Sequence, residues 1–205
     1  MSGGRLFVAL DLPADVRAAL CRWCDRMAPA GVRRVPAVNL HVTLAFLGSR
    51  SAEQAAAVAS LLAELAGSDP PGELTTADAL WLPPRRPGVL TVALSGSAGL
   101  AALQAAVVAA LVDAIGFEPE RRPFRPHVTV GRVARGTSVR TVELKPPAAL
   151  SFAAEALTLY RSHTGAGGTR YEPLARRACR TCRLEPDNPT HPPLRAGRTD
   201  VLSDP

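Results

Sequence analysis

The feature that most constrains this chain is the tripeptide His-Val-Thr, which occurs twice, each time inside an apolar segment. It lies at 41–43 in NLHVTLAFLG and at 127–129 in RPHVTVGRVA, and the chain has only four histidines. Both segments predict β-strands, over 40–48 and 127–134. Side chains alternate between the two faces of a strand, so each His shares a face with its Thr, with their Cα atoms roughly 6.5–7 Å apart. The fold must therefore hold two strands that are apolar on one face and carry an imidazole and a hydroxyl on the other.

Around these two strands the sequence alternates between strand and helix patterns. The segment 51–67 begins with Ser51 and Gln54 at the spacing of a capping box and ends at a glycine, which predicts a helix. The two halves of the chain share little sequence apart from the tripeptide, so an internal repeat is only a structural hypothesis. The other expected elements are helices at 14–28 and 97–116 and strands at 5–12, 73–83, 88–95, 151–164 and 169–176.

Length and composition predict one folded domain followed by a tail. A chain of 205 residues that is 47% hydrophobic can bury a core, and we expect a single domain over 1–178. Residues 179–205 are rich in Pro and Arg without periodicity, which predicts a disordered tail. No apolar run reaches the ~18–20 residues of a membrane span, and the start lacks a signal-peptide pattern, so we expect a cytoplasmic protein with no membrane partner. The net charge of +6 suits a phosphate-bearing partner.

Four cysteines form two C-x-x-C pairs, Cys21 with Cys24 and Cys179 with Cys182. Such pairs can indicate a zinc site or a redox centre. The first pair lies in an amphipathic helical segment without the aromatic or proline neighbours of a redox motif. The second pair lies in the predicted tail. We therefore expect reduced thiols in both pairs.

If the two motif strands lie close together, their imidazoles and hydroxyls face one cleft. Imidazoles have an ordinary pKa near 6.5, so one can accept a proton while the other donates one in the same step. The hydroxyls would bind oxygens around the reacting atom. This arrangement fits in-line displacement at phosphorus, in which charge develops on the non-bridging oxygens. Two histidines without an acidic or thiol companion make a poor zinc site, so no metal is expected, and the residues alone do not say which histidine is the acid.

Arginines flank the second motif, and Arg132 is the strongest candidate for a phosphate contact, with Arg125 also close in sequence. By strand alternation Arg132 would project to the face opposite His127 and Thr129. A bulge at Gly131 would return Arg132 to the motif face.

Five segments, in order, resemble the 2H phosphoesterase superfamily and in particular its RNA 2′,3′-cyclic phosphodiesterase branch. The resemblance covers about residues 4–176 and implies an α+β, bilobal fold with two antiparallel sheets, outer helices, a central groove and a pseudo-two-fold axis. It implies metal-independent hydrolysis of terminal 2′,3′-cyclic phosphates of RNA or nucleotides to 2′-phosphomonoesters, without a cofactor and by a monomer. The segments are RLFVALDLP, NLHVTLAFLG, PPRRPGVLTVAL, RRPFRPHVTVGRV and LYRSHTGAGGTRYEPLA.

The same resemblance implies roles for particular residues. His41 would donate a proton to the leaving oxygen, and His127 would accept one from water. Thr43 and Thr129 would bind phosphate oxygens. Further substrate contacts are expected from Arg125, Arg132, Phe46, Tyr160 and Ser162. Two alternatives remain open at this point, a 2′–5′ RNA ligase or phosphodiesterase and a non-catalytic module that binds RNA ends.

Overall fold

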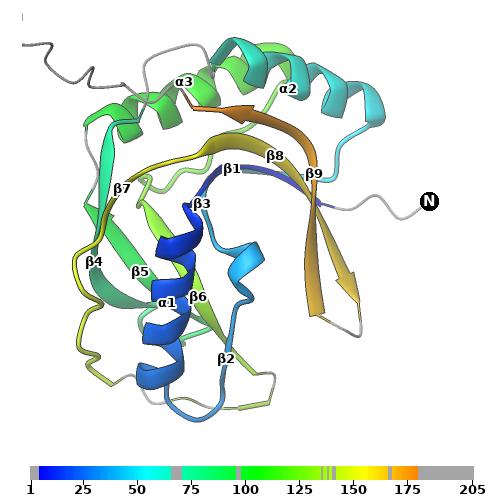
Figure 1. Ribbon diagram of the computed structural model, residues 1–205. Coiled ribbons are helices and arrows are strands. Elements are labelled where there is room, and N and C mark those ends of the chain that lie inside the picture. The colour runs from blue at the N-terminus through cyan, green and yellow to red at the C-terminus, as the bar shows by residue number, and fades with distance from the viewer. Residues whose placement is uncertain are drawn as a thin grey trace, which may run out of the picture.

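The computed structural model describes residues 5–65, 71–95, 98–134, 136, 137, 139, 142–165 and 168–179 (Figure 1). Helices and strands follow one another much as the sequence predicts, with a short strand and a 3₁₀ turn added between the first helix and the first motif. In chain order the elements are β1 (Arg5–Asp11), α1 (Ala14–Met27), β2 (Val32–Arg34), η1 (Ala37–Asn39), β3 (His41–Gly48), α2 (Ala52–Leu65), β4 (Glu73–Leu82), β5 (Val89–Ser95), α3 (Ala98–Ile115), β6 (His127–Val133), β7 (Ser151–Ala153), β8 (Ala156–Gly165) and β9 (Gly168–Ala178).

The strands form one curled antiparallel sheet in the order β7-β4-β5-β6-β3-β1-β8-β9, with β2 paired to β6 (Figure 1). The expected two sheets are therefore joined into one. The junction is narrow, because β3 and β6 pair only through Val42 and Val128, the central residues of the two tripeptides. Both valines are fully buried, so packing of the apolar face holds the two motif strands together at that point.

Helices cover the sheet in two places. α2 packs against α3, β8 and β9, and α3 also contacts β3, whereas α1 packs against β6, β2 and η1. Figure 1 shows α2 and α3 side by side above β1 and β8, with α1 along β6. The expectation that no apolar run reaches the length of a membrane span was wrong for α3, which by length and composition is apolar enough to cross a membrane. In this fold α3 packs one face against the core, where it buries Leu100, Leu103, Val107 and Leu111.

The predicted capping box begins α2. The Gln54 backbone N–H donates to the Ser51 hydroxyl at 3.1 Å, and the Ser51 N–H donates to the Gln54 side-chain oxygen at 3.2 Å. These reciprocal bonds satisfy two N–H groups that have no partner inside the helix. The glycine expected to end this helix, Gly67, lies outside the described residues.

The predicted strand 151–164 is broken, and its two parts lie in different halves of the sheet. β7 pairs with β4 at one edge, whereas β8 pairs with β1 and β9. The chain leaves the sheet at 154 and 155, where the Glu155 N–H donates to the Asp11 carbonyl at 3.0 Å. The continuous apolar pattern concealed this crossover, because both parts bury side chains in the same core.

Cys21 and Cys24 are free thiols buried on the inner face of α1, as predicted. Their Sγ atoms lie near the backbone carbonyls of Val35 and Val130, at 4.0 and 3.4 Å. Burial raises the pKa of Cys24 to about 11, so this thiol stays protonated at neutral pH. Of the second pair, Cys179 is a free thiol, while Cys182 and the predicted tail beyond it lie outside the described residues.

Candidate active site

The two motif strands bend in the same way immediately after their threonines. On β6, Thr129 and Gly131 pair with the consecutive residues Thr91 and Leu90 of β5, so one β6 residue is extra. On β3, Thr43 and Ala45 pair with consecutive residues of β1 in the same manner. An extra residue in one strand is a β-bulge, and it reverses which face the following side chains occupy.

The bulges bring one more side chain from each strand to the face of the motif. Phe46 lies five residues after His41, and Arg132 lies five residues after His127. Both are exposed and line the pocket described below. The bulge that Gly131 could introduce is present, and it returns Arg132 to this face. Gly131 makes room for β2, because a Cβ atom at this position would lie 2.6 Å from a methyl group of Val32.

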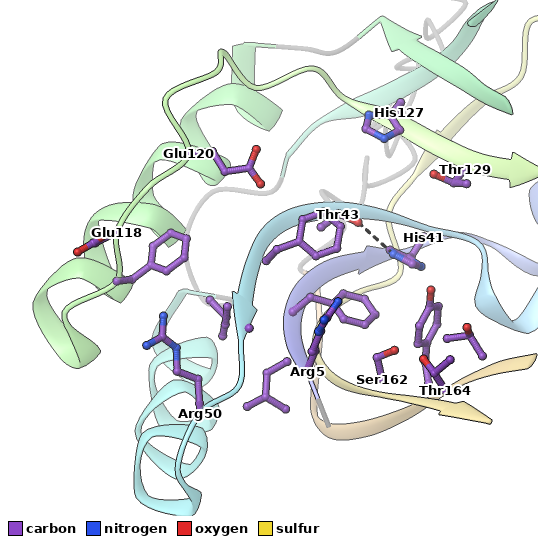
Figure 2. Close-up of a pocket in the computed structure, with 18 of the residues that line it drawn as sticks. Arg5, His41, Thr43, Arg50, Glu118, Glu120, His127, Thr129, Ser162 and Thr164 are labelled. Carbon is purple, nitrogen blue, oxygen red and sulfur yellow. Dashed lines mark hydrogen bonds between the residues drawn. The ribbon is translucent and has the colours of Figure 1, made fainter. Parts of the chain in front are cut away.

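A pocket of about 880 Å³ lies over the junction of β3 and β6. Antiparallel pairing of Val42 with Val128 sets His41 opposite Thr129 and Thr43 opposite His127. All four side chains line the pocket, and Figure 2 shows them around its upper right part. The structure therefore brings the two predicted pairs together, although 86 positions separate them in the sequence.

The ring of His41 is held on several sides. Its Nδ1 lies 2.8 Å from the Asn39 carbonyl, and its Nε2 lies 3.1 Å from the Thr43 hydroxyl. A carbonyl can only accept, so Nδ1 carries the proton and donates. The rings of Phe7 and Tyr171 pack against the imidazole, with centroids 4.9 and 5.3 Å away. This arrangement leaves Nε2 as the nitrogen that exchanges a proton.

His127 is held in the same manner but without an aromatic enclosure. Its Nδ1 donates to the carbonyl of Arg125, two residues earlier, at 2.7 Å. His41 likewise donates to the carbonyl two residues before it. Both histidines therefore carry the proton on Nδ1 when neutral and leave Nε2 for chemistry.

Burial and neighbouring charges set the protonation state of His41. Burial lowers the pKa of His41 from 6.5 to about 4, and the nearby positive charges of Arg132 and His127 act in the same direction. The hydrogen bond to Asn39 and the negative charge of Asp11 oppose the shift. The ring of His41 is therefore neutral at pH 7.

Two residues predicted to bind substrate through their side chains lie elsewhere. The Arg125 side chain is exposed and does not line the pocket, and its contribution is the carbonyl that holds His127. The Tyr160 hydroxyl donates to Asp11 at 2.8 Å, so it is turned away from the pocket lining. Ser162, which was also predicted to contact substrate, lies two residues farther along β8 and lines the pocket.

Asp11 is a buried carboxylate next to the site. It is 5% exposed and lies opposite His41 in the β1–β3 register. Its carboxylate accepts hydrogen bonds from Thr158, Tyr160 and Arg176 at 3.1, 2.8 and 2.8 Å. These hydrogen bonds hold β8 and β9 against β1, the strand that pairs with the strand carrying His41.

Sequence reasoning missed several pocket residues, chiefly Arg5, Arg50 and Tyr171. Strand alternation from Ser162 through the final hairpin could have suggested Tyr171, because the two residues are paired. Nothing local marks the arginines, since Arg5 begins β1 and Arg50 lies in the loop between β3 and α2. Across the described residues, no group of three or more His, Cys, Asp or Glu side chains could hold a metal ion.

Comparison with known proteins identifies the class that this fold and site define. A sequence model described as the 2′-5′ RNA ligase superfamily matches residues 13–166. The chain belongs to this superfamily, the 2H phosphoesterase family that its doubled motif resembles.

Individual relatives match along most of their length. An RNA 2′,3′-cyclic phosphodiesterase of Escherichia coli K12 is 36% identical over 84% of this chain and 94% of its own length. A solved structure of E. coli LigT complexed with NADP+ has a TM-score of 0.70 at 36% identity, covering 88% of this chain and 100% of that one. A structure from Thermus thermophilus has a TM-score of 0.74 at 27% identity, covering 85% and 97%.

Proposed function

We propose that this protein hydrolyses 2′,3′-cyclic phosphate ends of RNA or nucleotides to 2′-phosphomonoesters, as an RNA 2′,3′-cyclic phosphodiesterase. The observation that carries the proposal is the pair of imidazoles from β3 and β6, each tethered through Nδ1 to the carbonyl two residues before it. Both line one pocket with Thr43 and Thr129. The curated relative from E. coli carries this activity in its name and supports the assignment.

The chemistry follows from the placement of these groups. His127 accepts a proton from the attacking water, and His41 gives a proton to the 3′-oxygen as its bond to phosphorus breaks. Thr43 and Thr129, each opposite the histidine of the other strand, donate hydrogen bonds to the non-bridging oxygens. Arg132 neutralises charge at the same phosphate.

His41 must acquire a proton before it can act as the donor. It is neutral in the free protein at pH 7, because burial and nearby cations lower its pKa to about 4. A bound cyclic phosphate brings a negative charge next to the ring, which favours the imidazolium and raises the pKa. Substrate binding and protonation of His41 are therefore linked.

We also propose that the two halves of the sheet, β7-β4-β5-β6 and β9-β8-β1-β3, are related by a pseudo-two-fold axis through the Val42–Val128 pair. Matching bulges after the two motifs support this relation. Each half then supplies one imidazole and one hydroxyl. We propose that the protein acts as a cytoplasmic monomer.

The direct test is incubation of the purified protein with 2′,3′-cyclic AMP in excess EDTA. We expect adenosine 2′-monophosphate as the product, identified by chromatography against the 3′ isomer. The 3′-monophosphate, or tight binding without product, would contradict the proposed reaction.

The linkage at His41 predicts different pKa values for its ring in the free protein and in a complex with a bound phosphate. In the free protein this pKa is lowered to about 4, and a negative charge next to the ring raises it. We expect an NMR titration of the His41 ring to give a pKa at least one unit higher with bound adenosine 2′-monophosphate than without it. Equal values would show that the bound phosphate does not charge His41.

A further inference from the structure

The pocket extends well beyond the two histidines along strands β1, β8 and β9. Arg5 on β1 pairs with Ser162 on β8, and Ser162 pairs with Tyr171 on β9, so the three form one row across the sheet. Thr164 and Thr169 pair with each other in the adjoining row. All five residues line the pocket.

These rows offer one cation and a set of hydroxyl groups without partners. Within the described part of the chain, Arg5 forms no ion pair, and the hydroxyls of Ser162, Thr164 and Thr169 form no hydrogen bond. Figure 2 shows Arg5 beside Ser162 and Thr164, with the carboxylates of Glu118 and Glu120 at the other end of the pocket. A cation and neutral donors without a nearby carboxylate are complementary to a phosphate group.

Arg5 lies beside the reacting groups rather than among them. Phe7, whose ring packs on His41, lies two residues beyond Arg5 on the same face of β1. Two strand residues span roughly 7 Å, so Arg5 is the next side chain on this face after the one that contacts His41. The pocket therefore offers a cation outside the pair of histidines.

We propose that Arg5, with Ser162 and Thr164, forms a second phosphate subsite that binds the 5′-phosphate of the terminal nucleotide. In an RNA chain this group is the phosphodiester to the preceding nucleotide, and a cyclic mononucleotide with a free 5′-hydroxyl lacks it. The preferred substrate is therefore an oligonucleotide or a 5′-phosphorylated nucleotide. The inference rests on the proposed function for the place of the cyclic phosphate.

The test compares adenosine 2′,3′-cyclic phosphate with its 5′-phosphorylated form. A charge-assisted contact at a partly exposed site is expected to raise kcat/KM about tenfold for the 5′-phosphorylated substrate. Arg5→Gln, at an exposed position, is expected to bring the ratio of the two kcat/KM values close to one. Arg170→Gln removes the same charge from the neighbouring strand β9, outside the pocket lining, and it is expected to keep the wild-type ratio. A wild-type ratio near one, or an unchanged ratio in Arg5→Gln, would overturn the subsite.

A binding measurement separates the subsite from the proposed activity. Calorimetry with adenosine 2′-monophosphate and adenosine 2′,5′-bisphosphate requires no turnover. If the wild type hydrolyses neither cyclic substrate but binds the bisphosphate about tenfold more tightly in an Arg5-dependent way, the subsite stands and the proposed reaction fails. Equal affinities for the two nucleotides would refute the subsite whatever the activity.

Discussion

Replacing His41 or His127 by alanine is expected to lower kcat for 2′,3′-cyclic AMP by about 10²–10⁴-fold, the usual contribution of a positioned general acid or base. Each substitution removes one of the two Nε2 atoms of the pocket and leaves the apolar face of its strand unchanged. The two groups act on the same displacement, so the double variant should be far less impaired than the product of the single effects. Steady-state kinetics on the three variants measure this directly.

His163 provides a matched control for the two histidines. It lies on β8 outside the pocket lining, and its Nε2 bonds to Glu172 at 2.7 Å. His163→Ala should keep kcat within about twofold, because it touches no group of the site. Full activity in either His41→Ala or His127→Ala would refute the acid–base assignment for that histidine.

Replacing Asp11 by alanine is expected to destabilise the protein by about 3 kcal/mol. The change leaves the fully buried Thr158 hydroxyl and the partly buried Tyr160 hydroxyl without their acceptor, and each such loss costs about 1–3 kcal/mol. For a chain of this length the melting temperature should fall by roughly 6–12 °C. Urea and thermal denaturation measure the two quantities.

The control for Asp11 is a second carboxylate on the same arginine. Glu155 binds Arg176 at 3.3 Å, but its side chain is 40% exposed, whereas that of Asp11 is 6% exposed. Exposed ion pairs contribute at most about 1 kcal/mol, so Glu155→Ala should change stability little. Equal losses in the two variants would show that burial of the Asp11 network is not what stabilises this part of the sheet.

Local patterns in the sequence were sufficient to predict most helices and strands and the histidines and threonines at the centre of the site. Period-two alternation put each motif histidine on the same face as its threonine, and the apolar residues between them are buried as expected. The Ser51 capping box and the α1 thiols depend only on neighbouring residues in the chain, so they too could be predicted. Strand alternation alone would have placed Arg132 on the face opposite His127, and the sequence offered a bulge at Gly131 only as a condition for its return.

Contacts between segments that are far apart in the sequence decided the rest of the fold and of the site. That Tyr160 binds a carboxylate rather than lining the pocket depends on Asp11, 149 positions earlier in the chain. The single valine pair between β3 and β6 joins the two sheets that the family resemblance implied, and the break at 155 carries the chain from one half to the other. The sequence by itself determined which faces carry the reactive groups, because side-chain alternation is a local property of a strand. Only the tertiary structure decided which side chains meet in the pocket, how deeply His41 is buried and where Arg5 lies, because strand order and burial depend on the packing of the whole core.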